Sequence, residues 1–328
     1  MDRFSEIDSR ILRELLKDGR AGYAKIAGAL DLDKNLVFNR FEVLKRKGII
    51  IGATTQVNIY SMGFLGVGEI YFNKDRIDID RLSEIQKNHI PDSFFAPDIA
   101  NSCTIVKLLR NYEDLRNVRY LIREKFPKVE AKTCTWGGMV MNIPENLSFG
   151  LPDTKRGNES NTLKLRGQVT QKTPSILDAQ DRKMVELLTE NGRISFRKLA
   201  ELLKVTTDTV SRRYKKLEEN GLLKVVIQIN PEKIGYNADL ELRIEMQSGC
   251  NPLLAIQSLC NISDVFLIYE TIGDYDLHVF ALIKDIKHMF EIKEQIETNP
   301  IFAKIDMNIN KTCLNTYPYG GQAITTIR

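Results

Sequence analysis

The sequence lacks the features on which several classes of protein depend. Its 328 residues contain no run of about 18 apolar residues, so no membrane-spanning helix is expected. The first residues lack the basic start and apolar core of a signal peptide, which predicts a cytoplasmic protein. The five cysteines form no Cys-x-x-Cys pair, and there are three histidines. We therefore expect reduced thiols, without a disulfide framework or a metal site.

Motifs for common cofactors and reactions are missing as well. The chain has no glycine-rich phosphate-binding loop and no recognisable nucleophile triad. We therefore expect no cofactor and no enzymatic activity.

The net charge of +4 is modest, but it is unevenly distributed. Residues 1–50 and residues 177–225 each carry a net charge of +3, whereas residues 226–328 carry −5. Residues 146–176 carry a further +3, so the positive charge lies in the repeated segments and in the stretch between the halves. This distribution is an electrostatic footprint for a polyanionic partner. The alternative is a pair of ordinary solvated helical surfaces.

What the sequence does contain is an internal repeat. Residues 7–20 return as residues 180–193, with Gly19 matching Gly192 at an offset of 173 residues. The same offset relates Val37 to Val210 and Gly48 to Gly221. The repeat favours two tandem halves, each with its own core.

Each copy of the repeat has the pattern of three short helices followed by a strand. In the first copy, apolar residues recur at helical spacing, and Gly19 is expected to end the first helix. Asp33 is the predicted cap of the third helix, and Gly48 its end. The matching cap region of the second copy is Thr206 and Thr207. This order is typical of a helix-turn-helix module, although plain three-helix interaction domains share it.

The remainder of each half alternates strands with two helices in the order βαββαβ. This order predicts an α+β fold in which each winged helix-turn-helix is followed by a ferredoxin-like sandwich. Polar, glycine-containing sequence separates the halves and predicts a linker. The predicted domains are residues 1–52, 53–143, 177–225 and 226–328, with the linker at 144–176.

At this level of detail the chain resembles the Lrp/AsnC, or feast/famine, family of transcription regulators. The resemblance rests on the repeated opening, on the repeated close from Arg40 to Ile50 and from Arg213 to Leu223, and on the residues 273–276. It implies sequence-specific binding to double-stranded DNA, and a sandwich domain that dimerises and in many members binds an amino acid or another small effector. Most members are single units, so this chain resembles two units fused in tandem. We expect self-association within the chain, as a pseudo-dimer, and between chains.

The resemblance places the third helix of each copy in the DNA major groove. Its N-terminal exposed side chains, which include Phe38 and Asp208, are expected at base edges, and its basic residues at phosphates. A solvated helix face is the alternative, and a shared structural role is a further one for Arg40 and Arg213. The predicted DNA-binding residues are Lys34, Asn35, Asn39, Arg40, Lys45, Arg46 and Lys47 in the first copy, and Thr207, Ser211, Arg212, Arg213, Lys215 and Lys216 in the second.

The residues 273–276 resemble the effector loop of the family. Gly273 can adopt a positive φ, Asp274 and Asp276 could accept from a ligand amino group, and Tyr275 could form a wall. A polar hairpin turn is the alternative. The matching residues 99–102 carry none of these groups, so we expect an effector site in the second half alone.

Two other functions fit parts of the pattern. The expected fold also resembles that of the sirohaem decarboxylases, which occur as fused pairs of such units, and acid chemistry on a tetrapyrrole would need His, Tyr and Arg near the strand turn. His278 follows that turn, but it fits a strand face equally well. The second alternative is an interaction protein in which one unit binds DNA and the other dimerises.

Overall fold

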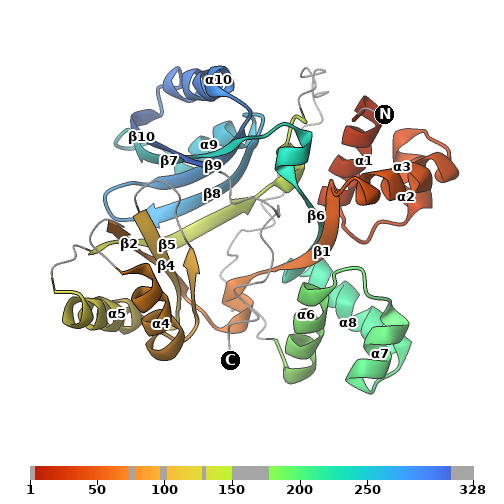
Figure 1. Cartoon of the computed structure of the whole chain (residues 1–328), viewed down its shortest axis with the longest axis horizontal. Coiled ribbons are helices and arrows are strands. Elements are labelled where there is room, and N and C mark those ends of the chain that lie inside the picture. The colour runs from red at the N-terminus through yellow and green to blue at the C-terminus, as the bar shows by residue number, and fades with distance from the viewer. Residues whose placement is uncertain (1–3, 74–77, 97–101, 128–130, 150–176, 312–328) are drawn as a thin grey trace.

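The computed structural model describes residues 4–73, 78–96, 102–127, 131–149 and 177–311 (Figure 1). The helices of the two repeats lie together on one side of the molecule, and the eight-stranded sheet with its covering helices lies on the other (Figure 1). Within these residues, no helix is both long and apolar enough to cross a membrane. The predicted α+β fold is confirmed.

The first module consists of three helices and a strand. Ser5 and Asp8 form a capping box at the start of its first helix, and Asp33 caps the third by accepting from the backbone of Asn35 and Leu36. Gly48 ends that helix with a φ of 68°, as predicted. The elements are α1 (Glu6–Lys17), α2 (Tyr23–Leu30), α3 (Lys34–Arg46) and β1 (Ile50–Val57).

The second module repeats this order. Thr206 caps its third helix, and Gly221 ends it with a φ of 67°. The elements are α6 (Ala179–Glu190), α7 (Phe196–Leu203), α8 (Thr207–Glu219) and β6 (Leu223–Ile229). The helix-turn-helix pattern with a following strand is therefore present twice.

The two modules share one hydrophobic core. Strands β1 and β6 pair antiparallel, α1 packs on β6, and α6 packs on β1. Leu12 and Leu15 of the first module lie in the same buried cluster as Leu188 and Val225 of the second. The expectation that each half has its own core is wrong here, because each first helix covers its apolar stripe with the strand of the other module.

The two βαββαβ units are confirmed, and each has the strand order fourth, first, third, second. The first unit contains β2 (Gly66–Asn73), α4 (Ile79–His89), β3 (Ser93–Ala96), β4 (Ser102–Leu109), α5 (Tyr112–Lys125) and β5 (Ala131–Asn142). The second contains β7 (Ala238–Met246), α9 (Pro252–Cys260), β8 (Val265–Ile272), β9 (Leu277–Ile283), α10 (Ile286–Glu297) and β10 (Phe302–Lys311). Short 3-10 turns are η1 (Ile59–Met62), η3 (Pro144–Asn146) and η4 (Pro231–Ile234).

The two units form one antiparallel sheet of eight strands, in the order β10-β7-β9-β8-β5-β2-β4-β3. They are joined where β5 pairs with β8, with a register shift between Trp136 and Val140. The sequence predicts a shorter strand at 129–135, whereas β5 extends to Asn142 and so reaches the second unit. Each unit keeps a separate core under its own helices.

Candidate nucleic-acid interface

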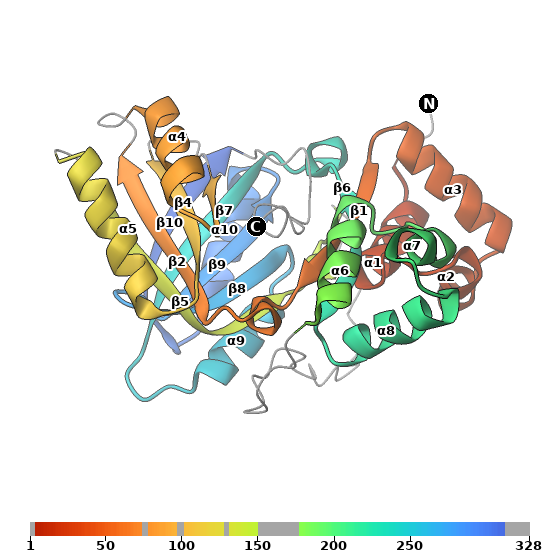
Figure 2. The same ribbon diagram turned by 90° about the horizontal axis from the view of Figure 1, so that it is seen from below.

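The third helix of the first module buries one face and exposes the other. Val37, Phe41 and Leu44 are buried and fix the rotation of α3 in the module. The opposite face is open to solvent, and Figure 2 shows α3 and α8 at the end of the molecule remote from α4 and α5. The predicted DNA-binding residues on this face are all exposed: Lys34, Asn35, Asn39, Lys45, Arg46 and Lys47.

The third helix of the second module is built in the same way. Val210, Tyr214 and Leu217 are buried at the positions that match Val37, Phe41 and Leu44. The predicted residues Thr207, Ser211, Arg212, Lys215 and Lys216 are exposed. One chain therefore carries two recognition-type helices.

Arg40 and Arg213 differ from the other predicted DNA-binding residues, because both are held inside their modules. Arg40 donates to both carboxylate oxygens of the buried Asp8, with Nε to Oδ1 at 2.7 Å. Arg213 donates to Asp178 at 2.7 Å and to Asp181 at 2.8 Å. Each guanidinium ties the third helix to the start of the first helix. Arg40 and Arg213 therefore have the shared structural role that was the alternative to DNA binding for both residues.

The carboxyl of Asp8 is ionised in this arrangement. Burial opposes ionisation, but the hydrogen bonds from Arg40 and Ser5 outweigh it and hold the pKa of Asp8 below its ordinary value. The residue is therefore a charged, internally paired part of the scaffold.

A reciprocal pair of arginines crosses between the modules. Arg20 donates to the carbonyl oxygens of Gly192 and Ile194 at 2.6 and 2.9 Å, and Arg193 donates to that of Gly19 at 2.9 Å and to that of Ala21 at 3.4 Å. We call Arg20 and Arg193 the arginine clasp. Its two halves occupy matching positions of the repeat, so the clasp has the symmetry of a two-fold dimer contact within one chain.

Aromatic rings of the opposite module support the clasp. The guanidinium of Arg20 lies 4.5 Å from the ring centre of Phe196, and that of Arg193 lies 5.3 Å from the ring centre of Phe41. Phe41 belongs to α3, so the clasp contacts a recognition-type helix directly. The repeat shows Arg20 and Arg193 in the sequence, but it does not show that each reaches into the other copy.

The glycines before the clasp residues allow the modules to approach closely. A Cβ on Gly19 would lie 2.6 Å from the backbone of Val226, and its amide donates to the carbonyl of Val225 at 2.8 Å. Gly19 has no positive φ, and α1 ends at Lys17 with Asp18 as its cap. The helix therefore ends next to Gly19, as predicted, but not because Gly19 adopts a left-handed conformation. Gly19 is needed because the strand of the other module passes next to it.

The predicted effector turn is bonded within the fold. Gly273 has a φ of 148°, as expected. The carboxylate of Asp276 accepts from the backbone N–H of Met246 at 2.7 Å, and the Tyr275 hydroxyl donates to Asp306. Asp274 is exposed. Two of the three predicted ligand-binding side chains are thus engaged in holding the turn.

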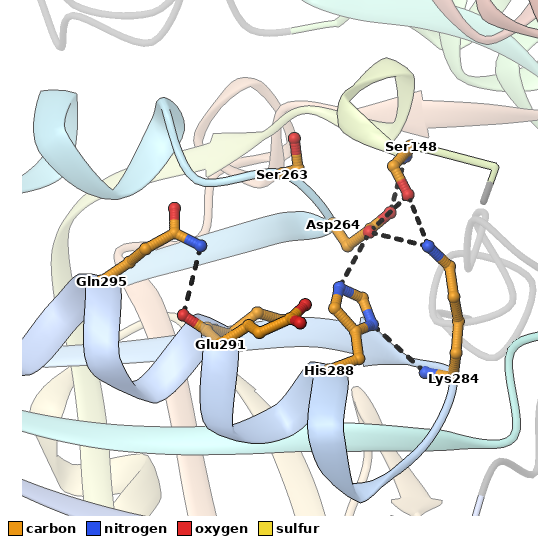
Figure 3. A pocket seen from close by; sticks show the side chains of 8 residues that line it. Ser148, Ser263, Asp264, Lys284, His288, Glu291 and Gln295 are labelled. Atoms are coloured by element: carbon orange, nitrogen blue, oxygen red, sulfur yellow. Dashed lines mark hydrogen bonds and ion pairs between the residues drawn. The ribbon is translucent and has the colours of Figure 1, made fainter. Parts of the chain in front are cut away.

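A small cavity of about 160 Å³ lies elsewhere, along α10 (Figure 3). At its centre the buried Asp264 accepts from Ser148 Oγ at 2.7 Å and from the Tyr236 hydroxyl at 2.5 Å, and His288 Nε2 lies 3.2 Å from it. Burial opposes ionisation of Asp264, but these hydrogen bonds keep its pKa below the ordinary value. Lys284 donates to Ser148 Oγ at 2.8 Å.

This cluster fixes the first residues of the predicted linker. Leu147, Ser148 and Phe149 are buried, and the Phe149 amide donates to the Tyr236 hydroxyl at 2.9 Å. The sequence does not reveal this contact, because Phe149 and Tyr236 are 87 residues apart in the chain. The remainder of the predicted linker, residues 150–176, lies outside the described residues.

His278 is a buried strand residue between acidic partners from both units. Its Nε2 lies 2.8 Å from Glu241, and its Nδ1 lies 3.7 Å from Glu69 of the first unit. Burial tends to raise the pKa of Glu241, but the hydrogen bond with His278 and the nearby Arg243 lower it to about 2.

Comparison with known proteins gives matches for both modules. Residues 177–218 match the AsnC-type helix-turn-helix domain, and residues 4–51 match a winged helix-turn-helix DNA-binding domain. The HTH-type transcriptional regulator FL11 of Pyrococcus furiosus is 32% identical over 115 residues, which are 35% of this chain and 76% of that protein. The regulator Ptr1 of Methanocaldococcus jannaschii is 32% identical over 117 residues, covering 35% and 77%.

A likeness over nearly the whole chain concerns the fold alone. The crystal structure of the sirohaem decarboxylase NirDL in complex with an iron-uroporphyrin III analogue matches with a TM-score of 0.57 at 15% identity. The match covers 94% of this chain and 91% of that one. The arrangement of two modules and two sheet units in a single chain therefore has a precedent among solved structures.

Proposed function

Because the chain belongs to the Lrp/AsnC family of helix-turn-helix transcription regulators, we propose that a single chain reads two half-sites in DNA. Helices α3 and α8 are its two reading elements. In this proposal one chain does what two identical subunits do in a symmetric dimer.

The support for this proposal is the rigid coupling of the two modules. A shared core, the β1–β6 pairing and the arginine clasp all resist movement of α3 relative to α8. Half-site spacing depends on the distance and angle between two recognition helices. A chain that fixes both should accept a narrow range of spacings.

The proposed contacts follow from exposure and charge. Each module has a net charge of +3, and the exposed lysines and arginines of both helices are suited to phosphates. We omit Arg40 and Arg213 from the proposed base contacts, since both are paired with carboxylates. The remaining residues are Lys34, Asn35, Asn39, Lys45, Arg46 and Lys47, with Thr207, Ser211, Arg212, Lys215 and Lys216.

Selection of bound sequences from random DNA tests the proposal. The full chain should recover a two-part site with fixed spacing, and its affinity should fall steeply as salt is raised. Lys34→Ala and Arg212→Ala should change protection at different half-sites. Identical footprint changes for both variants contradict the proposal. Sedimentation of the complex counts the chains at each site and tests self-association between chains.

An effector site at Gly273, Asp274, Tyr275 and Asp276 is a second part of the proposal. The exposed carboxylate of Asp274 at the tip of the turn supports it. Calorimetry with amino acids should detect binding to the wild type and not to Asp274→Ala. Equal binding by both proteins places any effector elsewhere.

A tetrapyrrole enzyme is the alternative function. The whole-chain likeness to NirDL and the position of buried His278 between Glu69 and Glu241 favour testing it. Titration of the purified protein with an iron uroporphyrin, followed by absorbance, decides the question. A shifted absorbance band that His278→Ala abolishes would support the enzyme, and an unchanged spectrum would remove it.

A further inference from the structure

The matched positions of the two recognition helices carry side chains of different base preference. Asn35 and Asn39 lie one turn apart on the exposed face of α3. At the offset of 173 residues, α8 has Asp208 and Arg212 in their places. All four side chains are exposed, and none has a hydrogen bond or ion pair to another described residue.

An exposed aromatic ring strengthens the contrast. Phe38 lies beside Asn35 and Asn39 and is 45% exposed, although it meets the edge of the Tyr23 ring at 5.4 Å between centres. The matching residue of α8 is Ser211. A phenylalanine on a DNA-facing surface leaves apolar area in water unless an apolar group covers it, and the thymine methyl is the apolar group of the major groove.

The chemistry of base edges turns these differences into a preference. Asparagine pairs in bidentate fashion with the N6 and N7 atoms of adenine, whereas arginine pairs with the O6 and N7 atoms of guanine. A carboxylate such as that of Asp208 accepts from the N4 amino group of cytosine. Glu42 and Lys215 lie further along their helices, away from the N-terminal residues that meet base edges.

We propose that α3 reads an A·T half-site through Asn35, Asn39 and Phe38, and that α8 reads a G·C half-site through Asp208 and Arg212. This inference rests on the proposed function, since it assigns a base class to each of its half-sites. The complete site is then A·T-rich at one end and G·C-rich at the other, and the chain binds it in one orientation.

The first experiment is selection from random DNA with the full chain and with two reciprocal variants. Asn35→Asp with Asn39→Arg should convert the A·T half-site to G·C, and Asp208→Asn with Arg212→Asn should convert the other half-site to A·T. The substituted positions are exposed, so circular dichroism should show an unchanged fold. At each contacted base pair, the wild type should bind DNA with the assigned base about tenfold or more tightly than DNA with another base.

The second experiment removes a single methyl group. Replacing thymine by uracil in the A·T half-site should weaken wild-type binding by about fourfold, as expected for one buried methyl group. The Phe38→Ala variant should bind both DNAs equally, and Ser211→Ala is the matched control that keeps the fourfold loss.

The outcomes distinguish a failure of the proposed function from a failure of the base assignment. Failure to enrich any two-part site overturns the proposed function. Enrichment of a two-part site with half-sites of the same base class, or with half-sites that do not follow the reciprocal variants, overturns this inference and leaves the proposed function standing. A uracil effect that Phe38→Ala does not abolish removes Phe38 from the inference.

Discussion

The two modules anchor their third helices with matched arginines, but the anchors differ in burial. Arg40 is 17% exposed and its partner Asp8 is 1% exposed, whereas Asp178, a partner of Arg213, is 53% exposed. In the first module the pair is part of the core. In the second, Asp181, which matches Asp8 in the repeat, is 16% exposed and Arg213 is 31% exposed, so the anchor is only partly buried. A repeat can thus conserve a contact while changing its contribution to stability.

The sheet units differ at matched positions too. Asp92 and Asp264 both have a positive φ, and both meet a basic residue that follows the third strand of the unit. In the first unit the pair is Asp92 with the exposed Arg110. In the second, Asp264 has gained Tyr236, Ser148 and His288. The second unit has built a buried polar network where the first has one ion pair.

The largest expected difference follows from the buried anchor. Arg40→Leu leaves Asp8 buried without its cation and should lower the free energy of unfolding by about 3 to 5 kcal/mol. The matched Arg213→Leu should lower it by less, about 1 to 2 kcal/mol, because Arg213 and Asp181 are only partly buried and Asp178 is exposed. Urea denaturation of both variants measures the difference. Equal losses would show that the two anchors are equivalent despite their burial.

The pH dependence of stability should reveal the buried pair of Glu241 and His278 in the second unit. Glu241 has a pKa of about 2 in the folded protein and an ordinary value of 4.5, so its ionised form stabilises the fold. That contribution is complete above about pH 4.5 and is lost as the pH falls towards 2; it amounts to about 3 kcal/mol. His278→Ala should flatten this part of the profile.

Glu69→Gln is the control for the pH experiment. Glu69 lies on the other side of the same histidine, but at 3.7 Å instead of 2.8 Å. The variant should keep most of the loss of stability between pH 4.5 and 2. If His278→Ala keeps the wild-type profile, the buried histidine does not hold Glu241 in its ionised form.

The two glycines at the module interface should tolerate a methyl group unequally. A Cβ on Gly19 would meet the backbone of Val226 at 2.6 Å, whereas one on Gly192 would meet Cγ1 of Val225 at 2.8 Å and the backbone of Ala53 and Thr54 only at 3.0 Å. Gly19→Ala should destabilise by about 2 to 3 kcal/mol and Gly192→Ala by about 1 kcal/mol. Thermal unfolding measures the loss of stability of the two variants. A larger loss for Gly192→Ala than for Gly19→Ala would contradict this account of the interface.

The sequence predicts features that depend on neighbouring residues, such as helix caps. It fails for features that depend on contacts with the other half of the chain. Asp33, Thr206, Gly48 and Gly221 act within one turn of their helix, so the sequence locates both third helices. Gly19 looks like a helix terminator, but its role depends on a strand more than 200 residues later in the chain. Arg20 and Arg193 donate to backbone carbonyls, which every residue has, so the sequence cannot indicate these partners. The site residues on the outer helix faces need no tertiary partner, and their exposure follows from the helical period alone.

The smallest expected effect concerns the segment that follows β5. Tyr236→Phe removes the hydroxyl that donates to Asp264 and accepts from the Phe149 amide, and it keeps the ring. Since both partners are buried, the free energy of unfolding should fall by about 1.5 to 2 kcal/mol. Arg110→Ala, at the matched pair of the first unit, should cost about 0.5 kcal/mol, because Arg110 is exposed.

Hydrogen exchange adds a local test: the amide of Phe149 should lose protection in Tyr236→Phe and keep it in Arg110→Ala. Unchanged protection of that amide would mean that the polar network of the second unit does not hold this segment in place, and the two sheet units would then be more alike than their contacts suggest.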